Sequence, residues 1–163
     1  MIKIGQYDYK GLIKSYLARD KLWASTADKR MSYIGHKLYS YNSILAKIIY
    51  SQPNTLYINK ATAKYSNTTQ RQTRKLLYAA AEENWTVFII DISLPIDENL
   101  KQFWSEVELL ITRYKRARTS KPFIKQSIHE TISTAQHLAE WHGLDSTIPD
   151  PIMRQLFVNS LLH

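Results

Sequence analysis

Hydrophobic residues recur at helical spacing along the C-terminal third of the chain. Over residues 96–114 they return every three or four positions, which is typical of a helix that buries one face. A second stripe covers residues 124–139 and stops before Gly143, a residue type common just past a helix end. Asp150-Pro151, a cap followed by a first-turn proline, begins a third stripe. We therefore predict three helices in this part of the chain.

The middle of the chain has the pattern of strands and turns. Tyr, Ile, Ser and Asn dominate residues 33–50, and Gln52-Pro53-Asn54 is a turn signal before a short apolar run at 55–59. Residues 85–92 are apolar at successive positions, which is typical of a central strand buried on both faces. Residues 44–50 fit a strand or a helix equally well, because short apolar runs have no decisive period.

Two further helices are predicted before the C-terminal group. Asp8 is a candidate N-cap for a helix whose apolar residues lie between positions 9 and 17. Asn67, with Thr68 as a competing candidate, caps a helix that runs to about Glu83. The first of these helices precedes the strand-like region, and the second lies within it, between the runs at 55–59 and 85–92.

The predicted elements define an α+β fold. We expect a small, mostly antiparallel sheet at about residues 31–92, packed with an N-terminal helix and a C-terminal group of three helices. A chain of 163 residues is usually one domain. We therefore predict a single domain over residues 1–163, with a sheet-containing core at 31–92 and a helical part at 96–162.

Composition and charge narrow the class of protein. The formal net charge is +8, from 22 Lys and Arg against 14 Asp and Glu. The absence of cysteine excludes a disulfide framework, a thiol nucleophile and cysteine-based zinc sites. No apolar run approaches the roughly 20 residues that span a bilayer, and the N-terminal segment lacks the apolar core of a signal peptide. We therefore expect an intracellular protein without membrane contact.

The sequence contains no complete catalytic or cofactor motif. Among the five histidines, only His137 has a candidate metal ligand, Glu140, at helical spacing. Four glycines are too few for the phosphate-cradling loops of nucleotide-binding enzymes. We therefore expect no metal, no cofactor and no catalytic residue. One enzymatic alternative stays open, a small metal-independent ribonuclease, whose base, acid and cation are available among His36, Tyr39, Tyr41, Arg71 and Arg74.

Lysine and arginine concentrate in two short clusters. One lies near the start of the helix predicted from Asn67 and contains Arg71, Arg74 and Lys75. Cations at that end of a helix oppose its dipole, so another reason for them is expected. The other lies at the end of the long C-terminal helix and contains Arg113, Lys115, Arg116 and Arg118. The helix dipole accounts for only part of this second cluster, and such density is typical of a surface that contacts phosphate.

Eleven tyrosines are available as stacking or packing groups. Strict alternation would place Tyr33, Lys37, Tyr39 and Tyr41 on one face of a strand, where the rings form a platform for unpaired bases. Tyrosines that rim a small core, with the ring inward and the hydroxyl outward, are the alternative for most of them. A protein interface is a third interpretation, because Tyr, Trp and Arg are enriched at interfaces.

Three segments resemble a pattern found in small uncharacterised bacteriophage proteins: Ser40-Tyr41-Asn42-Ser43-Ile44-Leu45-Ala46, Leu56-Tyr57-Ile58-Asn59 and Tyr65-Ser66-Asn67-Thr68-Thr69-Gln70-Arg71-Gln72. In that pattern a polar turn precedes an apolar strand, a strand ending in Asn follows, and a Ser-x-Thr-Thr segment starts a helix. The resemblance covers roughly residues 30–90. It implies a phage or mobile-element origin and action in the host cytoplasm, and it assigns no activity.

The leading hypothesis is a non-catalytic, phage-type accessory protein that binds DNA or RNA. Cations would contact phosphate and tyrosines would stack on bases, at Lys37, Tyr39, Tyr41, Arg71, Arg74, Lys75, Arg113, Lys115, Arg116 and Arg118. One alternative is a protein that inhibits a host defence complex, in the manner of anti-CRISPR proteins, or a host transcription complex, with Trp23 as an interface anchor. The ribonuclease is the other alternative. The sequence indicates no oligomeric state.

Overall fold

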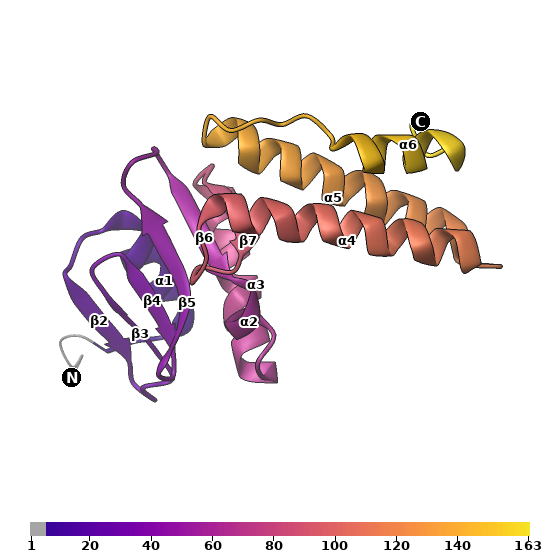
Figure 1. Ribbon diagram of the computed structural model, residues 1–163. Helices are drawn as coiled ribbons and strands as arrows, with labels where there is room; N and C mark the ends of the chain where they lie inside the picture. Colours follow the sequence, from indigo (N-terminus) through magenta and orange to yellow (C-terminus); the bar gives the residue numbers. More distant parts are fainter. Residues whose placement is uncertain (1–5) are drawn as a thin grey trace. The chain divides into compact units, whose positions relative to one another are not determined.

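A computed structural model describes residues 6–163 (Figure 1). The chain forms two compact units, Met1–Ser93 and Leu94–His163. The first contains the sheet and helices α1 to α3, and the second contains helices α4 to α6. The boundary between the sheet-containing and helical parts, at residues 93 and 94, falls between the two predicted ranges, 31–92 and 96–162. That they form one domain stays a prediction.

The first unit contains one seven-stranded sheet whose strands follow each other in sequence order. The strands are β1 (Gln6–Tyr7), β2 (Trp23–Thr26), β3 (Met31–Ile34), β4 (Lys37–Ser40), β5 (Ser43–Ile49), β6 (Thr55–Asn59) and β7 (Thr86–Ile90). The strands from β2 to β6 form an antiparallel meander, and the two outermost pairs, β1 with β2 and β6 with β7, are parallel. The predicted mostly antiparallel α+β fold is confirmed at this level.

The sheet begins earlier in the chain than about residue 31, where the prediction placed it. The strands β1 and β2 were missed because two and four residues are too few to show a period. The ambiguous run at 44–50 belongs to strand β5. Since β5 pairs with β4 on one side and β6 on the other, tertiary pairing decides what the sequence left open.

Three helices belong to the first unit: α1 (Tyr9–Ala18), α2 (Lys60–Ala63) and α3 (Asn67–Glu82). The predicted cap of α1 is confirmed, because the Asp8 carboxylate accepts a 2.7 Å hydrogen bond from the amide of Gly11. The predicted cap of α3 was wrong. Ser66, one residue earlier than Asn67, accepts from the amide of Thr69 at 3.1 Å.

One face of the sheet packs against α1 and α3 and forms the core of the first unit. Its largest fully buried side chains from the strands are Met31, Tyr33, Leu38, Leu45, Ile48, Leu56 and Ile58. We call this the inner face of the sheet and the opposite one the outer face. The hydroxyl of Tyr33 lies 2.7 Å from the Ser15 hydroxyl on α1, so the buried phenol keeps a hydrogen-bond partner.

Tyr33 was expected to share a face with Lys37 and Tyr39, and this was wrong. Gly35 and His36 form a tight turn between β3 and β4, and Gly35 adopts the positive φ of 57° that favours glycine. The turn restarts the alternation, so that Tyr33 pairs with Leu38 on the inner face. Lys37 and Tyr39 consequently lie on the outer face, and Tyr33 belongs to the core.

The second unit consists of α4 (Ile96–Arg116), α5 (Lys121–Trp141) and α6 (Asp150–Val158), which confirms the three predicted helices. Asp150 is the first residue of α6 rather than its cap, which is Pro149. The core of this unit comprises Val107, Ile111, Ile128, Ile132, Ile152, Leu156 and Leu161. Among the described residues, 6–163, no helix is long and apolar enough to cross a membrane.

Candidate nucleic-acid interface

The outer face of strands β2 to β5 presents two rows of side chains. In the first row, each residue is the register partner of the next: Trp23, Ile34, Lys37 and Lys47. The second row is built the same way from Ser25, Ser32, Tyr39 and Ile44. Trp23 and Ile34 are 66% and 65% exposed. No acidic residue lies on any of these four strands, so the face presents aromatic, apolar, hydroxyl and cationic groups but no carboxylate.

Lys37 and Lys47 lie directly opposite each other on neighbouring antiparallel strands. The register shifts by one residue between Leu38 and Tyr39, and this irregularity brings Lys47 rather than Ala46 opposite Lys37. Like charges at such a pair of positions destabilise a sheet. Neither lysine has an ion-pair partner within the described part of the chain, residues 6–163. The pair therefore has a charge that the protein itself does not neutralise.

The two ammonium groups act on a neighbouring histidine. The pKa of His36 is held below its ordinary value, first by burial and then by the positive charges of Lys47 and Lys37. The ring of His36 lies 5.7 Å from the ring of Tyr50, centroid to centroid. Burial and the two lysine charges thus both favour the neutral form of this imidazole.

A pocket of about 420 Å³ lies beside the lysine pair. We call it the lysine pocket; it is lined by Lys37, Ser43, Ile44, Lys47, Asn59, Thr62, Ile92 and Ser93. The side-chain amide of Asn59 donates to the carbonyl of Ile44 and to the hydroxyl of Thr62, each at 3.1 Å. Ser93 donates from its amide and its hydroxyl to Asp91, which holds the pKa of that carboxyl low. The polar groups around the lysines are thus fixed by local hydrogen bonds.

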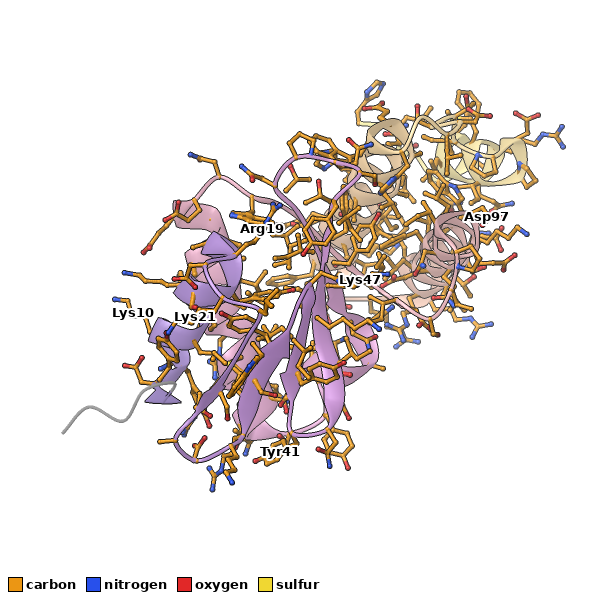
Figure 2. The ribbon with its side chains drawn as sticks, turned by 90° about the vertical axis from the view of Figure 1, so that its left-hand side faces the viewer. Lys10, Arg19, Lys21, Tyr41, Lys47 and Asp97 are labelled. Atoms are coloured by element: carbon orange, nitrogen blue, oxygen red, sulfur yellow. The ribbon has the colours of Figure 1, made fainter. Side chains whose placement is uncertain are left out.

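A second pocket of about 400 Å³ lies at the turn between β4 and β5. We call it the tyrosine pocket; it is lined by Ser40, Tyr41, Asn42, Ser43, Thr62, Tyr65, Ser66 and Thr69. Figure 2 shows Tyr41 at the hairpin end of the sheet, while Lys47 lies further along β5. Tyr41 is 46% exposed and Tyr65 is 83% exposed, so both rings are accessible at the pocket.

The predicted cluster on α3 is exposed but lies away from the lysine pair. Arg71, Arg74 and Lys75 are all exposed on this helix, which packs against the inner face of the sheet. The Lys75 ammonium lies 5.7 Å from the centroid of the Tyr9 ring. These cations therefore lie on the opposite side of the sheet from Lys37 and Tyr39.

The cations of the second unit lie at the junction of α4 and α5. Arg113, Lys115 and Arg116 occupy the last turn of α4, where the helix dipole favours positive charge. Lys115 donates a 2.6 Å hydrogen bond to the side chain of Gln155 on α6, and the Lys121 ammonium lies 4.8 Å from the Tyr114 ring centroid. Arg118 follows α4 and is exposed. Local structure therefore accounts for several of these charges.

The structure brings together only part of the predicted site. Lys37 and Tyr39 share the outer face, and Tyr41 lines the neighbouring tyrosine pocket. Sequence reasoning missed Lys47 and Ile34 as members of this surface, because only the strand register places them beside Lys37. Trp23 was singled out only as an anchor for a protein partner.

The residue types considered for metal binding or ribonuclease chemistry are dispersed. Within residues 6–163, no three His, Cys, Asp or Glu side chains are close enough to hold a metal ion. Of the ribonuclease candidates, Tyr39 lies on the outer face of the sheet, whereas Arg71 and Arg74 lie on α3 against the inner face. The described structure thus offers no single site that unites these groups.

Comparisons of the chain with protein-family models, with curated proteins and with solved structures gave no match. The functional interpretation consequently rests on the geometry and charge of the outer face and its two pockets.

Proposed function

We propose that the protein binds nucleic acid through the outer face of its sheet. The observation that supports this most directly is the pair Lys37 and Lys47, opposed across two strands on a face without acidic residues. Such a pair lowers the stability of the sheet unless an anion lies between or beside the ammonium groups. Phosphate is the anion that a polymeric partner would bring repeatedly to such a surface.

The aromatic residues of the same face favour an unpaired strand. Tyr39 lies on the same strand as Lys37, two residues further along. Trp23 lies in the same row as Lys37, separated from it by Ile34, and register partners on neighbouring antiparallel strands are about 5 Å apart. Aromatic rings on a sheet stack with exposed bases, whereas a duplex hides the faces of its bases. The proposed substrate is therefore single-stranded DNA or RNA, with phosphates at the lysines and bases on the rings.

The biological role we propose is that of a non-catalytic accessory protein of phage type, acting in the host cytoplasm. This part rests on the resemblance of residues 40–46, 56–59 and 65–72 to phage proteins. The clusters on α3 and at the junction of α4 and α5 remain proposed as additional phosphate contacts.

One observation favours a protein partner as the second candidate. Trp23 and Ile34 are adjacent register partners and are both about two-thirds exposed. Neighbouring exposed Trp and Ile side chains are typical of an interface, and an inhibitor of a host defence or transcription complex would use them as anchors.

Fluorescence anisotropy with labelled single-stranded DNA, RNA and duplex DNA across a salt series tests the proposal. We expect single strands to bind most tightly and the variant Lys37→Glu/Lys47→Glu to bind them about 100-fold more weakly at low salt. The control Lys10→Glu/Lys14→Glu makes the same change in net charge on α1, against the inner face. Equal losses in both variants, or no binding at low salt, would overturn the proposal and direct attention to a protein partner.

A further inference from the structure

The lysine pocket and the tyrosine pocket adjoin each other. Ser43 on β5 and Thr62 on α2 line both of them. Their volumes of about 400 and 420 Å³ each lie in the range of ordinary small-ligand sites. A ligand with two chemically different parts could therefore occupy both pockets at once.

The tyrosine pocket suits a neutral, planar group. None of its eight lining residues is charged, and they supply hydroxyl groups and the amide of Asn42. Tyr41 and Tyr65 add two accessible rings, which are the groups that stack on bases. A nucleobase has the matching combination of a flat face and hydrogen-bonding edges.

The backbone at Tyr41 adds a second indication. Its φ of 53° lies in the left-handed region, which is unfavourable for a residue with a bulky side chain. Glycine, Asn or Asp would satisfy such a hairpin turn at lower cost. A tyrosine at this position is consistent with a role for the ring itself at the pocket.

The tyrosine pocket is also firmly joined to the core of the first unit. The hydroxyl of Thr69 lies 3.0 Å from the hydroxyl of Ser40 and 3.0 Å from that of Ser66. These contacts connect β4 to the start of α3, and they unite two of the three segments that resemble phage proteins, 40–46 and 65–72. Hydrogen bonds therefore hold together the residues next to the two accessible rings, Ser40 beside Tyr41 and Ser66 beside Tyr65.

The lysine pocket suits an anion. It contains the only two charged side chains that line either pocket, Lys37 and Lys47, and both are partly buried. Ser43 and Thr62 form the boundary between the pockets, and the Thr62 hydroxyl there accepts a hydrogen bond from the Asn59 amide. A nucleotide joins an anionic phosphate to a neutral, planar base, which matches the different linings of the two pockets.

We propose that the two adjoining pockets form one nucleotide-binding site, with the phosphate at Lys37 and Lys47 and the base between Tyr41 and Tyr65. The ligand class is a nucleotide, either free or as one residue of a bound strand. The strand-bound case rests on the proposed function above, and the free case does not.

Isothermal titration calorimetry with the four ribonucleoside 5′-monophosphates, the matching nucleosides and inorganic phosphate tests the site on the full chain. We expect a nucleotide to bind more tightly than its nucleoside or phosphate alone. The variant Tyr41→Gly removes the ring and relieves the positive φ, so it should fold; combined with Tyr65→Ala, it should weaken nucleotide binding roughly 10- to 100-fold. Tyr78→Ala, which removes a 73% exposed tyrosine from α3, is the matched control.

A second pair of variants separates the two pockets. Lys37→Gln/Lys47→Gln should weaken nucleotide binding while nucleoside binding stays the same. Equal binding of phosphate and nucleotide, or no effect of the tyrosine variants, would overturn the nucleotide site. Strand binding that needs the lysines but not Tyr41 and Tyr65 would leave the proposed function intact and this inference wrong. Nucleotide binding without strand binding would support the site and identify a free nucleotide as its ligand.

Discussion

The two units of the protein differ in net charge. The first, residues 1–93, has 14 Lys and Arg against six Asp and Glu, which accounts for the whole formal charge of +8. The second, residues 94–163, has eight of each and is neutral. The most conspicuous run of cations in the sequence, 113–118, nevertheless belongs to the neutral unit. Charge density along the chain is therefore a poor guide to where uncompensated charge lies in space.

The units also differ in how their cations are stabilised. In the second unit, Arg113, Lys115 and Arg116 end a helix whose first turn contains Asp97 and Glu98, so the charges follow the helix dipole at both ends. In the first unit, Lys37 and Lys47 oppose each other on a sheet, a geometry that structure alone does not favour. A charge that the fold stabilises is stable without a ligand and can still contact phosphate, whereas a charge that destabilises the fold favours the presence of a ligand.

The largest expected effect that would sharpen this contrast concerns phosphate contacts of the second unit. For duplex DNA, a plot of the logarithm of the association constant against the logarithm of the salt concentration has a negative slope. The variant Arg113→Gln/Arg116→Gln/Arg118→Gln should reduce the magnitude of this slope by about 2 to 3, because each lost phosphate contact removes about 0.9 from it. The preference for single strands over duplex should stay unchanged, since the outer face is intact. Anisotropy titrations at four salt concentrations measure both quantities. Loss of strand preference in this variant would contradict the assignment of base contacts to the first unit.

Much of the fold was predictable from sequence because it depends on local patterns. The long amphipathic stripe of α4 and the cap at Asp8 are local signals, and both are confirmed. The short strands β1 and β2 lack a period, and the cap of α3 was misplaced by one residue, from Ser66 to Asn67. These errors occur where a signal is two to four residues long.

The candidate site was predicted only in part because it depends on register. Lys37 and Tyr39 were correctly placed on one face, but Tyr33 was not, since the turn at Gly35 reverses the alternation. Lys47 could not be found at all. Its position opposite Lys37 requires the one-residue irregularity between Leu38 and Tyr39, for which the sequence has no clear signature.

A smaller effect, on stability, tests whether the two sets of cations differ as argued. Lys37→Glu converts a like-charge pair into an opposite-charge pair and should raise the free energy of unfolding by about 0.5 kcal/mol. Arg116→Glu places an acid at the C-terminal end of α4 and should lower it by about 0.5 kcal/mol. Urea denaturation at low salt measures both changes. Changes of the same sign in the two variants would contradict the proposed difference between the two sets of cations. The stabilising variant, Lys37→Glu, should also bind nucleic acid less tightly.

The smallest expected effect is a change in the pKa of His36, which reports the field of the lysine pair directly. Burial lowers the pKa of His36 and the charges of Lys47 and Lys37 lower it further, whereas the lowered pKa of His142 in the second unit is due to burial alone. In Lys37→Met/Lys47→Met, the pKa of His36 should rise toward about 6.5 while that of His142 stays constant. Titration of the imidazole proton signals by NMR measures both pKa values.

The lowered pKa also makes stability depend on pH, because His36 binds a proton more readily in the unfolded chain than in the folded one. The stabilisation from neutral His36 is therefore present above pH 6.5 and is lost as the pH falls. This loss should be smaller in the variant. A constant His36 pKa would show that the lysine charges are already neutralised within the protein, and the need for an anionic ligand would disappear.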